Sequence, residues 1–179
     1  MVTVVGLDDD KLNTLCQDAI AECALSGHVK IGIANHMFPK GRVLSGHKTL
    51  CKWVVDNATK PKYGAAMVMA LPVAGAFHSS YMASARDGLQ AALSEVDISM
   101  PRIPVYSNVT ARPYGSVEEI RELLLRQLES PVLWEDSIKN MLSEKDTSWT
   151  FLDAGPGAQL KGMMRRIDKK AFSKTSVLA

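Results

Sequence analysis

The order of strand and helix patterns over residues 1–73 is the feature that most narrows what this chain can fold into. Asp8 is a typical helix N-cap, and the apolar residues that follow it recur at helical spacing as far as Cys23. The patterns are, in order, a strand over 2–7, a helix from Asp8 to Cys23, strands over 29–34 and 42–45 joined by 36–41, a helix around Trp53, and a strand over 65–73. This β-α-β-β-α-β order predicts a ferredoxin-like small subdomain.

Residues 74–179 are organised differently, because helix patterns outnumber strand patterns there. The expected elements are a helix over 80–96, a strand over 103–109, a helix opened by the S-x-x-E spacing of Ser116 and Glu119, a helix restarting at Ser130-Pro131 with proline first, a strand over 149–154, and a last helix after Gly155-Pro156-Gly157. So small a number of strands cannot shield the apolar faces of these helices. We therefore expect further strands to come from an upstream segment or from a partner chain.

Composition excludes several classes of protein. Apolar residues make up 46% of the chain and charged residues 22%, which allows a sizeable core. The formal charge of +2 is scattered, whereas a nucleic-acid-binding protein needs a concentrated basic face. No apolar run approaches the roughly 20 residues that span a bilayer, and the first residues match neither a signal peptide nor a transit peptide. Cys16, Cys23 and Cys51 lack metal or redox spacing and are expected to be buried thiols in a reducing compartment.

His78 is the candidate residue with the clearest chemical use. It lies in the segment Gly75-Ala76-Phe77-His78-Ser79-Ser80, between a strand pattern and an amphipathic helix pattern. The dipole at a helix N-terminus disfavours a charged imidazolium, and a general base must be neutral before it accepts a proton. The alternative is that His78 only helps to cap the helix, beside serines that are better caps.

Two further polar residues are candidates. Gln127 falls on or beside an apolar helical stripe, where its amide could orient a neighbouring side chain or a substrate, or lie partly wet at the edge of the stripe. Asn108, in Tyr106-Ser107-Asn108-Val109, follows a strand pattern whose end could line a cleft, although Ser-Asn is also ordinary turn chemistry.

Other features have ordinary structural explanations. Gly155-Pro156-Gly157 could let backbone N–H groups approach an anion, but more often such a segment is a tight turn. His28, His36 and His47 show no metal-ligand spacing. A late group of cations could meet an acidic partner or form a solvated helix face; its members are Lys161, Arg165, Arg166, Lys169 and Lys170. No G-x-S-x-G occurs, so there is no nucleophile elbow to place a serine beside His78.

Several motifs together resemble the malonyl-CoA:acyl carrier protein transacylases. LPVAGAFHSSYM resembles their histidine motif, IPVYSNVTARPY their Ser-Asn-Val strand, LLLRQLESPVLWEDSI their Gln-Leu and Ser-Pro-Val helix pair, and FLDAGPGAQLKGMMRRI their Gly-Pro-Gly helix. MVTVVGLDDDKL and IANHMFPKGRVLSGH resemble parts of their small subdomain. The segments GRVLSGH and AGAFHSS resemble the animal mitochondrial branch of the family more than the bacterial enzymes. This resemblance implies that the protein acts in the mitochondrial matrix.

This resemblance implies a fold, a reaction and its partners. Residues 1–73 would be the ferredoxin-like small subdomain, and residues 74–179 the C-terminal part of an α/β-hydrolase-like acyltransferase core. In the family a serine attacks malonyl-CoA with help from a histidine, and the thiol of acyl carrier protein then takes the malonyl group; no cofactor is needed, since malonyl-CoA is a substrate. His78 would be the catalytic histidine, Asn108 would hold its other ring nitrogen through a backbone carbonyl, and Gln127 would help to form the site.

The family's serine, its oxyanion loop and the arginine that binds malonate have no counterpart in this sequence. The first hypothesis is therefore a truncated transacylase, which needs its N-terminal segment. A second is a non-catalytic module that binds acyl carrier protein or another partner through the retained surface, including the late cations. A third is a separately encoded upstream half that restores activity on mixing.

Overall fold

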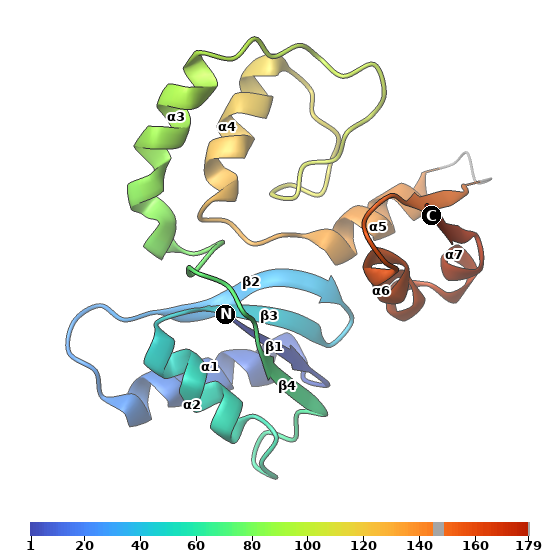
Figure 1. The fold of residues 1–179 in the computed structure, drawn as a ribbon. Coiled ribbons are helices and arrows are strands. Elements are labelled where there is room, and N and C mark those ends of the chain that lie inside the picture. Colours follow the sequence, from blue (N-terminus) through green and yellow to red (C-terminus); the bar gives the residue numbers. More distant parts are fainter. Residues whose placement is uncertain (145–148, 179) are drawn as a thin grey trace.

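The first part of the molecule is a sheet covered by two helices. The structure is a computed structural model that describes residues 1–144 and 149–178. Its first elements are β1 (Val2–Val5), α1 (Asp9–Cys23), β2 (Ile31–Phe38), β3 (Gly41–Gly46), α2 (Lys48–Asn57) and β4 (Met67–Ala70). The four strands lie in the order β2-β3-β1-β4, each neighbouring pair antiparallel, with α1 and α2 on the same side (Figure 1). The predicted ferredoxin-like arrangement is confirmed.

Local sequence signals account for where these elements begin and end. The Asp8 carboxylate accepts a hydrogen bond from the Lys11 N–H at 3.0 Å, so it caps α1 as predicted. Strand β2 runs to Phe38, which places His36 within a strand and not in the predicted connection. Register shifts in the pairing of β2 with β3 let the strand continue through this region.

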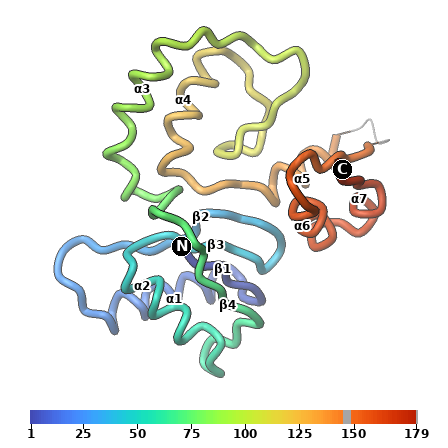
Figure 2. Tube along the Cα trace, viewed as in Figure 1, coloured from blue at the N-terminus to red at the C-terminus, as the bar shows by residue number. Residues whose placement is uncertain are grey.

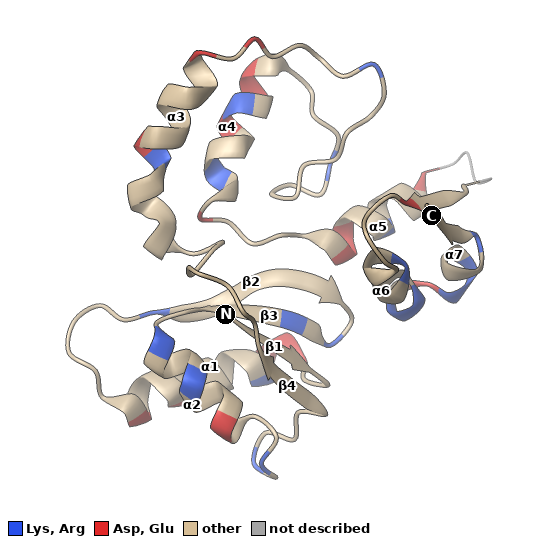
Figure 3. Ribbon diagram, viewed as in Figure 1, with Lys and Arg blue, Asp and Glu red and all other residues tan. Residues whose placement is uncertain are grey.

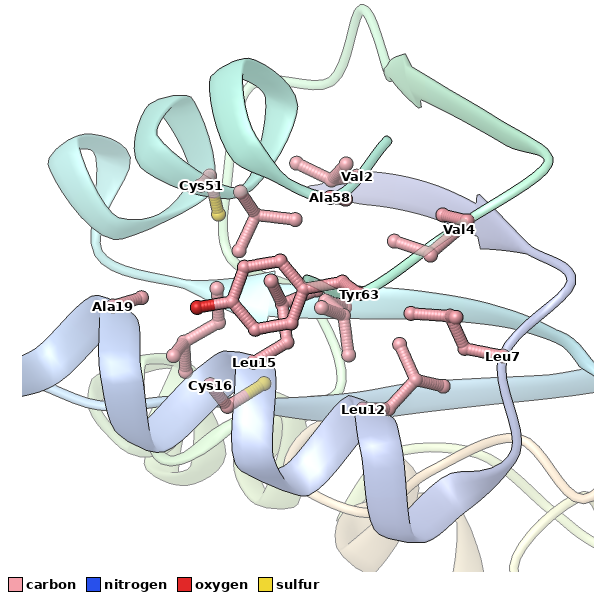
Figure 4. Close-up of a cluster of buried hydrophobic side chains, with 14 of the residues drawn as sticks. Val2, Val4, Leu7, Leu12, Leu15, Cys16, Ala19, Cys51, Ala58 and Tyr63 are labelled. Atoms are coloured by element: carbon pink, nitrogen blue, oxygen red, sulfur yellow. The ribbon is translucent and has the colours of Figure 1, made fainter. Parts of the chain in front are cut away.

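The main core lies between the sheet and the two helices (Figure 4). Leu12 and Leu15 of α1 and Leu50 of α2 pack there against Leu44 of β3, and all four side chains are fully buried. Cys16 and Cys51 are free, buried thiols in the same core, as predicted, whereas Cys23 is a free thiol that is only partly buried. Burial, followed by the proximity of Cys51, raises the pKa of the Cys16 thiol to about 12.

The second part contains mostly helices. Its elements are the 3₁₀ helix η1 (Ser80–Ala85), α3 (Arg86–Ser94), α4 (Val117–Gln127), α5 (Trp134–Ser143), β5 (Phe151–Asp153), α6 (Gln159–Ile167), α7 (Lys169–Ser173) and β6 (Thr175–Val177). Helices α3 and α4 lie side by side, whereas α5, α6 and α7 enclose a small core of Ile138, Met164 and Ala171 (Figure 1). Strands β5 and β6 form a parallel pair. The Ser116 hydroxyl caps α4 by accepting from the Glu119 N–H at 3.1 Å, as its S-x-x-E spacing predicted.

Two predicted elements of the second part are wrong in detail. The helix expected over 80–96 is divided into η1 and α3, and the strand expected over 103–109 is reduced to a single bridge between Tyr106 and Pro113. Ile103 is 71% exposed. A strand needs a hydrogen-bonded neighbour, and the β5-β6 pair does not extend to this segment.

The segment between α4 and α5 joins the two parts of the molecule. A helix was expected to restart at Pro131, but α5 begins only at Trp134. Val132 instead lies along the edge of β2: its N–H donates to the Ala34 carbonyl and its carbonyl accepts from the His36 N–H, both at 2.9 Å. Figure 2 shows the chain leaving α4 and crossing to α5 past this sheet edge. Pairing with β2 therefore replaces the first turn of the expected helix.

Candidate active site around His78

His78 lies in the turn that connects the sheet to η1. Its φ is +59°, which is uncommon for a residue with a side chain and marks a position held by its surroundings. Ser79 caps η1 by accepting from the Tyr81 N–H at 3.4 Å. His78 therefore precedes the cap of a short 3₁₀ helix and not, as expected, the first turn of a long α-helix.

The ring of His78 contacts the end of α4. Its Nδ1 lies 3.0 Å from the Gln127 backbone carbonyl oxygen. Because a carbonyl can only accept, this contact places a proton on Nδ1. The Gln127 side-chain amide lies 3.3 Å from the same Nδ1 and donates to the Ser130 carbonyl, also at 3.3 Å. These contacts hold the partly buried ring against the C-terminal end of α4.

The predicted partner of the ring was Asn108, and here the structure corrects the prediction. Asn108 is exposed, and its backbone carbonyl accepts from the Leu133 N–H at 2.8 Å. The neighbouring Ser107 hydroxyl accepts from the Val109 N–H at 3.1 Å, which is the ordinary turn chemistry considered as the alternative. The carbonyl that contacts His78 Nδ1 is that of Gln127, whereas the Asn108 carbonyl accepts from the Leu133 N–H.

The sequence singled out the side chain of Gln127, but the group that lies nearest to His78 Nδ1 is the main-chain carbonyl of this residue. Gln127 is the last residue of α4, and the last four carbonyls of a helix have no partner within the helix. One of these carbonyls is therefore available to His78. A prediction that α4 ends at Gln127 would have indicated that this carbonyl is free. The exact last residue of a helix, however, is poorly defined by sequence.

One cavity lies beside the turn, and His78 is not among its lining residues. It has a volume of about 590 Å³ and is lined by the start of β1, by one side of α2 and by residues 70–76. Gly75 and Ala76 are its members nearest to His78 along the chain. Within the part of the chain that the structure describes, the ring makes no hydrogen bond to a serine or cysteine side chain. The ring is thus held in place with no serine or cysteine side chain hydrogen-bonded to it among the described residues.

The two weaker candidates of the C-terminal region are explained by contacts within the chain. The Asp153 carboxylate accepts from the Gly155 N–H at 3.3 Å and from the Lys161 N–H at 3.0 Å, so the N–H groups expected to face an anion already face a carboxylate. The late cations lie on α6 and α7 (Figure 3). Two of them, Lys161 and Arg165, lie over the Phe172 ring.

Residues 1–144 and 149–178 contain neither a candidate membrane-spanning helix nor a candidate metal-binding group. No helix there combines the length and the apolar character needed to cross a bilayer. No group of three or more histidine, cysteine, aspartate or glutamate side chains converges in a way that could hold a metal ion.

Known proteins resemble the chain in sequence and in structure. No protein-family model matches it. It is 34% identical over 183 residues to the mitochondrial malonyl-CoA-acyl carrier protein transacylase of Homo sapiens, a match that covers 99% of this chain and 46% of the relative. The solved malonyl CoA-acyl carrier protein transacylase of Coxiella burnetii has a TM-score of 0.85 at 26% identity, covering 99% of this chain and 52% of that one.

A second solved structure bears on possible partners. It holds a type II PKS acyl-carrier protein in complex with its malonyl-transacylase, and the match has a TM-score of 0.82 at 26% identity over 98% of this chain and 52% of that one. This chain therefore spans about half the length of the relatives that it matches.

Proposed function

We infer, from a likeness to malonyl-CoA:acyl carrier protein transacylases over nearly the whole chain, that this chain supplies the catalytic base of such an enzyme. The reaction is the transfer of malonyl from CoA to the phosphopantetheine thiol of acyl carrier protein, for fatty acid synthesis. The relatives' mitochondrial names favour the mitochondrial matrix as its compartment. No cofactor takes part, since malonyl-CoA is itself the acyl donor.

One observation carries the proposal: His78 Nδ1 is held by the Gln127 carbonyl at 3.0 Å, so that Nε2 is the basic nitrogen. Nε2 would take the proton of a serine hydroxyl as its oxygen attacks the malonyl thioester, and would return it to the departing CoA thiolate. In the second half-reaction Nε2 takes the proton of the carrier thiol as its sulfur attacks the acyl-serine, and returns it to the serine oxygen. The Gln127 carbonyl stabilises the imidazolium that forms in each half.

The serine must come from a segment that this chain does not contain, because the sequence has no G-x-S-x-G. The surface supports a partner of this kind. Parallel strands normally lie buried in larger sheets, yet Leu152 of β5 is 59% exposed and Ile103 is 71% exposed. We propose that the nucleophile-bearing segment packs over these side chains and extends the β5-β6 pair, which would also give residues 103–109 the neighbour that a strand requires.

The rival proposal is a module that binds acyl carrier protein without catalysis. It is supported by the cations of the neighbouring helices α6 and α7 (Figure 3), of which Arg165, Arg166, Lys169 and Lys170 are exposed. This rival proposal gives His78 no chemical role. The two proposals therefore differ in whether malonyl transfer depends on His78, which can be measured.

A mixing experiment separates the two proposals. The chain is combined with the part of a related transacylase that it lacks, and malonyl transfer to holo acyl carrier protein is followed by mass spectrometry. We expect transfer by the mixture, no transfer by either component, and loss of transfer when the chain carries His78→Gln. Binding of carrier protein with no transfer in a mixture that forms a stable complex would favour the rival proposal.

A further inference from the structure

One ion pair crosses between the ferredoxin-like part and the helical part of the molecule. Arg42 of β3 donates from Nη1 to the Glu135 carboxylate of α5 at 2.7 Å. Both residues are buried, with 8% and 5% of their surfaces exposed. Among the ion pairs formed by residues 1–144 and 149–178, this is the only one that joins residues before 71 to residues after it.

Arg42 is held in a fixed orientation by further acceptors. Its Nη1 also donates to the carbonyls of Phe38 and Gly41, at 2.6 and 3.2 Å, and its Nε donates to Asp9 at 2.8 Å. A guanidinium held by several acceptors has little freedom to turn, and a lysine could not satisfy all of these geometries. Glu135 is therefore attached to a rigid point of the sheet.

The segment between Glu135 and Gln127 is bonded along most of its length. Val132 pairs with both Ala34 and His36 of β2, and the Leu133 N–H donates to the Asn108 carbonyl. The Ser130 carbonyl accepts from the Gln127 side-chain amide. The nine residues from Gln127 to Glu135 thus connect the carbonyl that contacts His78 to the buried ion pair. Hydrogen bonds of the backbone between these two ends restrict movement of the segment along β2.

We propose that Arg42 and Glu135 are positioning residues, which set the place of the Gln127 carbonyl and through it the tautomer of His78. The assignment of a chemical purpose to this tautomer rests on the function proposed above, but the coupling itself does not. Loss of the ion pair would free the start of α5, and the 128–133 segment would then shift along β2. The Gln127 carbonyl would move away from Nδ1, and the ring proton would no longer be confined to that nitrogen.

The ring-nitrogen signals of the ¹⁵N-labelled chain test this coupling directly. Long-range ¹H–¹⁵N correlation spectra distinguish Nδ1–H from Nε2–H histidine, and a His78→Gln variant identifies the His78 signals among those of the four histidines. We expect the Nδ1–H form to predominate in the parent chain. In Arg42→Met its ratio to the Nε2–H form should fall by about threefold to tenfold, which is the preference that one neutral hydrogen bond sustains.

A matched variant separates positioning from a general loss of stability. Asp9→Asn removes the other acidic partner of Arg42 but leaves the contact with Glu135, so its tautomer ratio should stay at the parent value. If the Arg42→Met chain does not fold, the His78 tautomer ratio is measured in Glu135→Leu instead. This substitution removes the carboxylate and keeps a side chain of similar volume on α5. A parent-like ratio in a folded Arg42→Met or Glu135→Leu chain would overturn the proposal.

This measurement needs neither malonyl-CoA nor carrier protein. Failure of malonyl transfer in the mixing experiment would therefore count against the proposed function alone, and an unchanged tautomer ratio would count against the positioning role alone. In an active mixture, folded Arg42→Met should lower kcat with little change in the KM for malonyl-CoA, because the proposed role is to orient the His78 ring and not to bind the acyl group. An equal loss in both variants, Arg42→Met and Asp9→Asn, would instead indicate a merely structural effect.

Discussion

At the scale of single residues, the site depends on a backbone atom more than on a side chain. The acceptor for His78 is the Gln127 carbonyl, which any residue at this position would present. The side-chain amide of Gln127 contributes a second contact by holding the Ser130 carbonyl. Substitutions at the two residues should therefore have unequal effects.

In the mixing assay, His78→Gln should lower malonyl transfer by about a hundredfold to ten-thousandfold, the usual contribution of a general base. Gln127→Ala retains the carbonyl and removes the side-chain contacts with His78 Nδ1 and with the Ser130 carbonyl, so its transfer rate should fall by less than about tenfold. The initial rate of carrier-protein acylation measures both. A Gln127→Ala loss as large as that of His78→Gln would show that the amide, and not the carbonyl, is the essential group.

Glu135 makes a second prediction at this scale. Burial opposes its ionisation, but hydrogen bonds from Lys139 and Arg42 outweigh burial and hold the pKa of the carboxyl below its usual value. A carboxyl with a lowered folded-state pKa stabilises the fold above its unfolded-state pKa, and this stabilisation is lost as pH falls through the folded-state value. Glu135→Gln should lower the free energy of unfolding by about 1 to 3 kcal/mol at pH 7.

The same variant should converge with the parent as the pH is lowered. Urea unfolding from pH 7 down to pH 3 gives the two curves, and their separation should shrink in the acid range. A separation that stayed constant over this range would show that the carboxylate charge of Glu135 does not contribute.

Residue types in the sequence singled out His78 but did not indicate how its ring is held. His78 was identified because a histidine between a strand and a helix has an evident chemical use, and it does contact Gln127, which the sequence also singled out. Asn108 was assigned the wrong contact, because the direction of a backbone carbonyl depends on neighbours far along the chain. The cation–carboxylate pair of Arg42 and Glu135 could not be predicted, since 93 positions separate its members.

At the scale of elements, the sequence predicted a helix or strand boundary correctly where the hydrogen-bond partners lie within the same segment. Asp8 and Ser116 cap the helices that they were expected to cap, because a cap is satisfied by N–H groups three residues away. The strand predicted over 103–109 failed because strands depend on neighbours from elsewhere. Pro131 suggested a helix start, but Val132 found a partner in β2 instead.

The close approach of β3 to the chain before β2 gives a prediction for one glycine. A Cβ at Gly46 would lie 2.3 Å from the Lys30 carbonyl oxygen and 2.5 Å from the Ile31 Cα, both of them backbone atoms. Gly46→Ala should therefore destabilise the chain by about 1 to 3 kcal/mol or more. Urea unfolding measures this change through the midpoint and slope.

Gly162 is the matched control for this substitution. It lies within α6, and a Cβ there would meet nothing within 4 Å. Gly162→Ala should stabilise the chain by about 0.5 to 1 kcal/mol, because alanine is the better helix former. Equal effects of the two substitutions would contradict the close packing at Gly46.

At the scale of the whole molecule, the two parts differ in how completely they are packed. The ferredoxin-like part has a continuous core and leaves Ile20, Met67 and Met69 exposed, whereas the second part leaves more large apolar side chains on the surface; among these are Phe77, Val96, Met100, Ile103, Val105 and Leu152. Exposed apolar groups of this extent mark interaction surfaces. Likeness to known structures over about half their length agrees with such a surface.

This uneven packing predicts how the chain behaves with its partner. The isolated chain should bind an apolar fluorescent dye, and the dye signal should fall when the complementary part of a related transacylase is added, because that part covers the exposed side chains. Ile103→Ser should weaken the complex and lower dye binding by the isolated chain. Undiminished dye binding in a mixture that transfers malonyl would mean that the partner covers another surface.

The most direct test of the central claim, that this chain supplies the base and not the nucleophile, is the intact mass of each component after incubation with malonyl-CoA. We expect this chain to gain no malonyl group, alone or in the mixture. The complementary component should gain one malonyl group only when this chain is present with His78 intact. A stable malonyl adduct on this chain itself would reveal a nucleophile of its own and would contradict the account.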